Sequence, residues 1–222
     1  MIDTLLSLVA PHYCSGCGEN GTLLCDNCKY DIVSESYNAC VACGKAQALT
    51  QGICTDCNVP YARGWCVADR RDQLERLINM YKFGNAKAAH KPLARLLHEY
   101  LPELPENVVI VPIPTVASHI RERGFDHMVL IAKHFAKYRR LPVASPLRRA
   151  TSTKQRDASR TKRIAQAKAA FACPQQLDGE KIYLLLDDVM TTGSTMRYAA
   201  QKLRAAGAEQ IWAATISRQP LD

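Results

Sequence analysis

The sequence predicts a doubly wound α/β domain with a parallel sheet, preceded by a small cysteine-rich segment that binds metal. From residue 65 onward, short apolar runs alternate with segments of helical period, and this order is typical of a parallel sheet covered by helices. Before residue 60, four C-x-x-C pairs occur, a spacing typical of four-thiolate metal sites. We therefore expect residues 1–60 to form a cysteine-rich domain and residues 61–222 to form the α/β domain.

Each element of the α/β domain has its own signal. Apolar spacing predicts helices over residues 72–83, 86–101, 126–138 and 194–206, and apolar runs predict strands at 65–68, 108–111, 141–147, 182–186 and 210–216. Residues 115–125 are expected to be a strand-to-helix loop with a turn at Gly124. Residues 148–168 are too polar for a core, so they predict a long functional loop that closes over a site, or else a solvated linker.

The most informative stretch is residues 182–195. A continuous apolar run, typical of a strand buried on both faces, ends in Asp187 and Asp188. Small hydroxyl residues and Gly193 follow, and then a helix begins. Backbone N–H groups at a helix N-terminus suit one phosphate, and adjacent carboxylates can accept hydrogen bonds from two neighbouring hydroxyls, as on a ribose. A simple helix cap would explain the hydroxyl residues but not the two acids.

Other phosphate motifs are absent from the sequence. Neither the G-x-x-x-x-G-K-[ST] pattern of nucleoside triphosphatases nor the G-x-G-x-x-G pattern of dinucleotide sites occurs. The positive charge is also localised, because residues 118–168 hold fourteen basic and three acidic side chains, whereas residues 1–66 hold three and six. A phosphate-rich partner is therefore expected at residues 118–168, and single-stranded DNA is one candidate.

The paired cysteines predict one or two structural zinc ions. Disulfides and an iron–sulfur cluster are the alternatives, and a reducing compartment disfavours the disulfides. Consecutive or interleaved pairing of the C-x-x-C motifs would both give four ligands. Because thiolate zinc sites add negative charge to an acidic segment, we expect a scaffold or docking role rather than nucleic-acid binding. The predicted ligands are Cys14, Cys17, Cys25, Cys28, Cys40, Cys43, Cys54 and Cys57.

The first residues predict neither a secretory signal nor a membrane anchor. Residues 1–11 are mildly apolar, lack a basic start and are too short to cross a bilayer. We therefore expect a cytoplasmic protein without membrane insertion. Lys82 lies at a predicted helix end, where it would either reach a ligand or remain solvated.

Residues 184–195 closely resemble the phosphoribosyl-diphosphate signature of type I phosphoribosyltransferases. The C-x-x-C set, the Lys82-Phe83-Gly84 step, the run Val111-Pro112-Ile113-Pro114, the loop with Arg121, Arg123 and Gly124, and residues 155–171 resemble the ComF/GntX family. The resemblance covers almost the whole chain and implies a type I phosphoribosyltransferase-like fold. It also implies binding of phosphoribosyl diphosphate with Mg²⁺ and transfer of the phosphoribosyl group to an acceptor that the sequence does not identify.

The resemblance also implies roles for individual residues. Asp187 and Asp188 would hold the ribose hydroxyls as the catalytic acids, and the loop after Pro114 would contact pyrophosphate. The ribose 5-phosphate site would comprise Asp187, Asp188, Val189, Met190, Thr191, Thr192, Gly193, Ser194 and Thr195. The pyrophosphate and lid contacts would comprise Lys82, Thr115, Arg121, Arg123, Lys154, Gln155, Arg160 and Arg163.

Two further expectations follow from the resemblance. Members of the family are linked to DNA uptake and competence, so a non-catalytic DNA-binding or adaptor role, with a competence helicase or channel protein as partner, is the alternative to catalysis. Asp126 and His127 replace the family's usual Asn-Gln pair. The histidines, His127 among them, are expected to be surface or packing residues.

Overall fold

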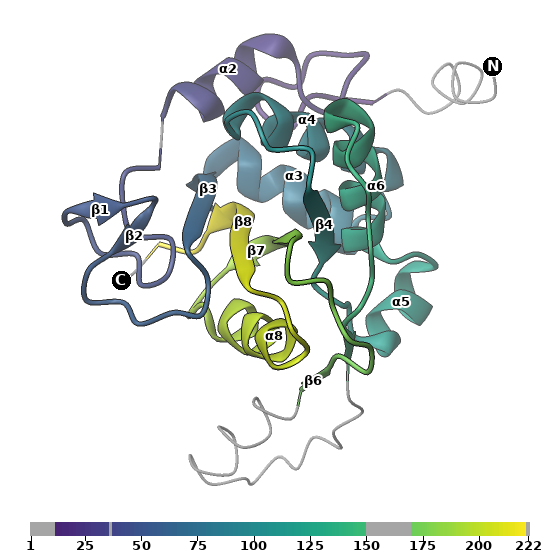
Figure 1. The fold of residues 1–222 in the computed structure, drawn as a ribbon. Coiled ribbons are helices and arrows are strands. Elements are labelled where there is room, and N and C mark those ends of the chain that lie inside the picture. The colour runs from purple at the N-terminus through teal and green to yellow at the C-terminus, as the bar shows by residue number, and fades with distance from the viewer. Residues whose placement is uncertain (1–11, 36, 150–169, 221–222) are drawn as a thin grey trace, which may run out of the picture.

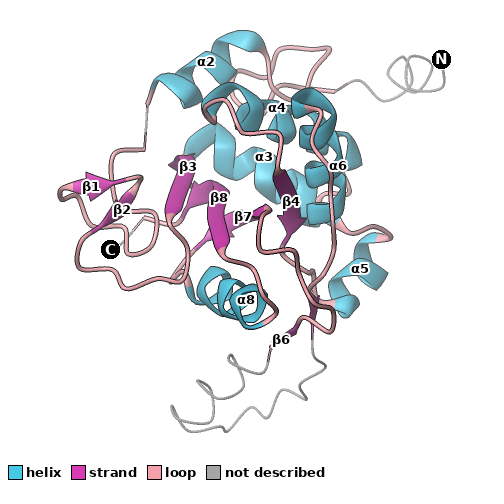
Figure 2. Cartoon of the chain, in the orientation of Figure 1, coloured by secondary structure: helices cyan, strands magenta, loops and turns pink. Residues whose placement is uncertain are grey.

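The computed structural model describes residues 12–35, 37–149 and 170–220. Its centre is a four-stranded sheet in the order β3-β8-β7-β4, and each neighbouring pair is parallel (Figure 2). The strands are β3 (Arg63–Asp69), β4 (Val108–Pro112), β7 (Ile182–Met190) and β8 (Gln210–Arg218). The predicted α/β class with a parallel sheet is thereby confirmed.

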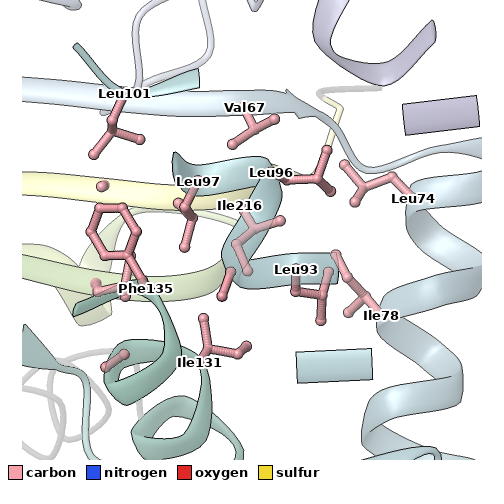
Figure 3. Packing of buried hydrophobic residues seen from close by; sticks show 14 of the residues in the cluster. Val67, Leu74, Ile78, Leu93, Leu96, Leu97, Leu101, Ile131, Phe135 and Ile216 are labelled. Carbon is pink, nitrogen blue, oxygen red and sulfur yellow. The ribbon is translucent and has the colours of Figure 1, made fainter. Parts of the chain in front are cut away.

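Helices cover both faces of the sheet, as Figure 1 shows. One face carries α3 (Asp72–Phe83), the short 3₁₀ helix η1 (Lys87–Ala89), α4 (His90–Tyr100) and α6 (His127–Arg139), whereas α8 (Ser194–Ala205) packs on the other face. Figure 3 shows leucine and isoleucine side chains of α3 and α4 packed together with Phe135 and Ile131 of α6 and with Val67 and Ile216 of the sheet. These side chains are buried, so apolar burial fixes the helices on the sheet.

Strand β7 is central because its sequence suits burial on both sides. Its first five residues, Ile182–Leu186, are all buried, and only toward the carboxyl end do half-buried positions alternate with buried ones. Residues at its carboxyl end therefore reach the edge of the sheet where α/β proteins commonly bind ligands.

Two local predictions in the α/β part were wrong. Residues 141–147 form no ladder: Val143 alone makes an isolated parallel bridge to Ile110, because Pro142 and Pro146 cannot donate backbone hydrogen bonds. Residues 115–125, expected to be a loop, contain the helix α5 (Ala117–Arg123), which ends at Gly124 in a left-handed conformation with φ of 75°. No residue of α5 is buried, so it carries no apolar period that would reveal a helix.

The long polar segment is joined to the domain by a short antiparallel pair. β5 (Arg148–Arg149) pairs with β6 (Phe171–Ala172), and Phe171 is buried, as expected for a residue that re-anchors the chain. Residues 150–169 lie outside the described part of the chain.

The cysteine-rich segment packs on both faces of the sheet at its β3 edge. It contains α2 (Asp26–Ser34), β1 (Leu49–Thr50) and β2 (Ile53–Cys54). Residues before 35 join the core that contains α3, α4 and α6, and residues from Cys40 join the core that contains α8. The segment shares both cores with the α/β part, and a domain boundary at residue 60 stays a prediction.

No helix within the described residues combines the length and the apolar character needed to cross a membrane.

Candidate functional site

The eight paired cysteines form two groups, each built from consecutive C-x-x-C motifs. The first cluster comprises Cys14, Cys17, Cys25 and Cys28, and the second cluster comprises Cys40, Cys43, Cys54 and Cys57. Within each cluster all sulfur atoms lie within 4.8 Å of one another. Of the two pairings that the sequence allowed, the structure therefore brings together the consecutive one.

Both clusters have dimensions that fit a zinc ion. The sulfur atoms of Cys17 and Cys25 are 3.7 Å apart, as are those of Cys43 and Cys54. A tetrahedral ion with Zn–S bonds of about 2.3 Å requires sulfur separations of about 3.8 Å. Backbone N–H groups also point at sulfur, for example from Cys25 to Cys14 Sγ at 3.3 Å. Each cluster could therefore hold one structural zinc ion.

The second site lies where β7 ends, at Asp187 and Asp188. Asp188 is buried, and its Oδ1 accepts a 2.8 Å hydrogen bond from Lys82 Nζ at the end of α3. Asp187 is half-buried and its Oδ1 accepts the backbone N–H of Asp188 at 2.9 Å. The structure therefore brings Lys82 and the two acids together.

The two carboxyl groups have opposite electrostatic environments. Desolvation by burial and the charge of Asp188 raise the pKa of Asp187, despite the opposing effect of Lys82. Desolvation also acts to raise the pKa of Asp188, but the contact with His127 and the charge of Lys82 outweigh it and hold that pKa well below its usual range. Asp188 is therefore the ionised member of the pair, and Asp187 is the one that gains a proton more easily.

The residues predicted to contact pyrophosphate lie in different surroundings. The guanidinium of Arg123 donates to the Lys82 carbonyl at 2.7 Å, and Thr115 Oγ1 donates to Asp126 Oδ1 at 2.8 Å. Arg121 is exposed at the end of α5. Arg123 thus contacts the Lys82 backbone, and Thr115 contacts the cap of α6. Arg121 is directed to solvent. Their contact with pyrophosphate stays a prediction.

The loop between β7 and α8 has the form expected of a phosphate site. Gly193 has φ of 72° and precedes the first residue of α8. Thr191, Thr192 and Ser194 are exposed, and Thr192 Oγ1 donates to Ser194 Oγ at 2.9 Å. Exposed hydroxyl groups therefore lie at the amide end of a twelve-residue helix, a position that favours an anion.

This loop is supported by the cysteine-rich segment. A Cβ atom at Gly193 would lie 3.0 Å from the carbonyl oxygen of Ala42, which lies between Cys40 and Cys43 of the second cluster. The carbonyl of Val41, the residue before Ala42, accepts a 2.6 Å hydrogen bond from Arg218 of β8, which is fully buried. The predicted lid contacts Lys154, Gln155, Arg160 and Arg163 lie outside the described residues.

His127 is the site residue that sequence reasoning missed. It is buried, with 7% of its surface exposed, and its Nε2 lies 2.9 Å from Asp188 Oδ2. The available signal was its position directly after Asp126, whose carboxylate caps α6 by accepting the N–H groups of Met128 and Val129. A residue directly after the cap lies in the first turn of α6, the helix that follows α5 and Gly124.

Comparison with known families gives a match at this point. The family model of the phosphoribosyl transferase domain matches residues 85–221. The chain belongs to the phosphoribosyltransferase domain family. The matched part contains β4, β7, α8 and β8, together with both acids and the phosphate loop, so the resemblance noted from the signature is confirmed at the level of the family.

Named relatives resemble the chain over most of its length. Competence protein ComFC of Bacillus subtilis (strain 168) is 26% identical over 195 residues, which cover 83% of this chain and 79% of the relative. DNA utilization protein YhgH of Escherichia coli (strain K12) is 29% identical, covering 85% of this chain and 95% of the relative. Competence protein F of Haemophilus influenzae is 28% identical, covering 85% and 87%.

Proposed function

We propose that the chain is a cytoplasmic protein that binds phosphoribosyl diphosphate with Mg²⁺ and transfers the phosphoribosyl group to an acceptor. One observation carries the proposal: Asp187 and Asp188 end β7 directly before a hydroxyl-rich loop at the N-terminus of α8. Within a phosphoribosyltransferase family member, this juxtaposition suits a ribose and its 5-phosphate. Asp188 Oδ2 is buried, and Lys82 Nζ at 2.8 Å and His127 Nε2 at 2.9 Å approach it without forming an aligned hydrogen bond, so it could also accept one from a ribose hydroxyl.

Each part of the site then has a chemical role. Residues 191–195 bind the 5-phosphate, and the two carboxylates accept hydrogen bonds from the ribose hydroxyls. Lys82 and Arg123 supply positive charge on the side where pyrophosphate leaves. The bond from C1 to the pyrophosphate oxygen breaks, a bond from C1 to the acceptor forms, and the acceptor loses a proton.

Magnesium fits the same donor set. Carboxylate oxygens are ligands that Mg²⁺ prefers, and it usually takes few of them from the protein and the rest from phosphate and water. Asp187 and Asp188 are the residues that would hold it, directly or through the ribose hydroxyls. The ion would supply charge that neutralises the pyrophosphate.

Isothermal titration with phosphoribosyl diphosphate and MgCl₂ tests the proposal. We expect the wild-type chain to bind and the double variant Asp187→Asn/Asp188→Asn to lose at least about tenfold in affinity, since hydrogen bonds to ionised groups are lost. Asp178→Asn is the matched control, because this exposed acid lies before the other end of β7. Absence of binding by the wild type, or equal binding by the double variant, would overturn the assignment.

A second candidate function, single-stranded DNA binding, is supported by a row of rings on α4 and α6. Ring centroids lie 5.2 Å apart for His90 and His134, 5.2 Å for His134 and Tyr138, and 5.0 Å for Tyr138 and His98. Exposed cations lie on or next to the same helices: Arg95 on α4, Lys133 and Lys137 on α6, and Arg140 directly after α6. Aromatic rings among cations suit stacked bases and their phosphates, and the names of the relatives fit a role in DNA uptake or use.

This surface coincides only partly with residues 118–168. Helix α6 belongs to that basic segment, whereas His90 and His98 come from α4. We expect a labelled oligothymidylate to bind with an affinity that falls steeply between low and moderate salt, and Tyr138→Ala to weaken it about 5- to 100-fold. Tyr30→Ala, at an exposed tyrosine of α2, is the control. Equal loss in both variants would contradict DNA binding by this surface. A competence helicase or channel protein as partner stays a prediction.

A further inference from the structure

The Asp188 carboxylate is approached by two side chains from different helices. Lys82 Nζ, on α3, lies 2.8 Å from Oδ1 and 2.8 Å from Oδ2. His127 Nε2, on the first turn of α6, lies 2.9 Å from Oδ2. The carboxylate and the imidazole are both almost fully buried, so solvent screens their interaction little.

The surroundings of the other ring nitrogen determine where the imidazole proton resides. Arg123 Nη1 lies 3.2 Å from His127 Nδ1, and a guanidinium can only donate. Nδ1 must therefore be the acceptor, which leaves the single proton of a neutral ring on Nε2, facing Asp188. A doubly protonated ring would place an N–H donor against the Arg123 cation.

A second contact at Nδ1 is consistent with this assignment. Thr115 Oγ1 lies 3.1 Å from Nδ1, but its hydroxyl also donates to Asp126 Oδ1 at 2.8 Å. Asp126 also accepts two amide N–H groups of α6, so its carboxyl oxygen is the acceptor that orients the threonine hydroxyl. Thr115 is thus oriented by Asp126, and Arg123 remains the donor to the ring.

The backbone and ring of His127 are also fixed from the opposite side. Tyr81 donates its hydroxyl to the His127 carbonyl at 2.8 Å, and the two rings meet edge to face at 6.1 Å. The imidazole therefore has little freedom to leave Asp188. Its N–H is not fully aligned with Oδ2, and hydrogen bonds in active sites often tighten only when substrate is bound.

We propose that His127 is a positioning residue for Asp188: as its neutral Nε2–H tautomer, held by Arg123, it fixes the carboxylate oxygen that receives the ribose hydroxyl. This inference rests on the proposed function and deepens it. It also gives Arg123 a role through His127 in addition to the predicted contact with pyrophosphate.

The tautomer can be measured without any ligand. We expect ¹⁵N-resolved NMR of the histidine rings to show a neutral ring protonated at Nε2, assigned to His127 by its loss in His127→Gln. Replacement of Arg123 by Met should shift the Nδ1 resonance, since the donor to that nitrogen is removed. A ring protonated at Nδ1, or an Nδ1 signal unaffected by Arg123→Met, would overturn the inference.

The positioning role is tested by comparing ribose 5-phosphate with inorganic phosphate. Inorganic phosphate needs only the loop at α8, whereas ribose 5-phosphate also needs Asp188. We expect His127→Ala to weaken ribose 5-phosphate binding about 10- to 100-fold and to leave phosphate binding unchanged, since one hydrogen bond to a charged group is lost. His127→Gln should restore part of the affinity, because its amide nitrogen can take the place of Nε2.

The outcomes separate the inference from the function on which it rests. His119→Ala is the matched control, because this histidine is exposed on α5. Wild-type protein that binds neither probe contradicts the proposed function. Wild-type protein that binds ribose 5-phosphate as tightly as His127→Ala contradicts the positioning role alone, as does an equal loss for both probes, which would indicate a general structural effect.

Discussion

The first and second cysteine clusters begin in the same way. The backbone N–H of Cys14 donates to the Glu19 carbonyl at 2.8 Å, and that of Cys40 donates to the Lys45 carbonyl at 3.0 Å. Two more backbone bonds of the first cluster, from Gly18 N–H to the Cys14 carbonyl and from Ser15 N–H to the Leu23 carbonyl, have counterparts in the second. The counterparts run from Gly44 to Cys40 and from Val41 to Gly52. The sulfur of the first cysteine in each cluster also accepts a backbone N–H at 3.3 Å, from Cys25 to Cys14 and from Cys54 to Cys40. The cysteine-rich segment is therefore a structural repeat of one four-cysteine unit.

The neighbours of the two clusters differ. Arg76 of α3 donates to the Ser15 carbonyl of the first cluster, and Arg218 of β8 donates to the equivalent Val41 carbonyl of the second. Arg76 is exposed, whereas Arg218 is fully buried. The first cluster thus rests on the helical face, while the second rests beside the loop that precedes α8. We therefore expect one unit to stabilise the helical layer and its repeat to support the candidate phosphate site as well.

Loss of one metal ligand from each cluster should separate these roles. We expect Cys17→Ser and Cys43→Ser, which change equivalent ligands, each to lower the zinc content by about one ion and to destabilise the protein by several kcal/mol. Only Cys43→Ser should also abolish binding of inorganic phosphate, because its cluster positions the Ala42 carbonyl against Gly193.

Elemental analysis and calorimetric titration on the folded fraction check this prediction. Phosphate affinity that falls equally in both variants would mean that the two clusters act only through global stability. Zinc content that is already zero in the wild type would remove the metal from the comparison altogether.

The two arginines give the next largest difference. We expect Arg218→Met to cost about 2–3 kcal/mol of unfolding free energy, because the buried Val41 carbonyl loses a charged donor. Arg76→Met should cost about 0.5–1 kcal/mol, since Arg76 is exposed and water can replace it. Urea unfolding of both variants provides the measurement, and equal losses would show that burial does not distinguish the two contacts.

Sequence patterns predicted those parts of the molecule whose chemistry is local. The buried strand ending in Asp187 and Asp188 was visible because residues 182–186 are uninterruptedly apolar. The eight paired cysteines were visible because C-x-x-C spacing is typical of four-thiolate metal sites. Even so, the spacing left the pairing of the motifs open, since either pairing gives four ligands.

The features that escaped prediction depend on contacts between distant parts of the chain. His127 and Asp188 are 61 positions apart in the sequence, and a buried histidine has no pattern that distinguishes it from a packed one. The apolar residues of 141–147 resemble a strand, but Pro142 and Pro146 remove the donors that a ladder needs. The contact of the second cluster with Gly193 joins residues about 150 positions apart, and no periodicity indicates it.

A matched pair of glycines gives the smallest effect and the most direct test of that contact. Gly124 and Gly193 have nearly equal positive φ values, 75° and 72°, so an alanine carries a similar backbone cost of about 1 kcal/mol at each position. Around Gly124 nothing lies within 4 Å of an added Cβ, whereas at Gly193 the Ala42 carbonyl lies at 3.0 Å and must move by a few tenths of an ångström. We therefore expect Gly193→Ala to cost about 1 kcal/mol more than Gly124→Ala in urea unfolding.

Gly193→Ala should also weaken phosphate binding, because the Ala42 carbonyl can move away only if the second cluster or the loop shifts. If the two alanines cost the same and phosphate binding is unchanged, the carbonyl yields freely, and the second cluster supports the loop no more than the first cluster does.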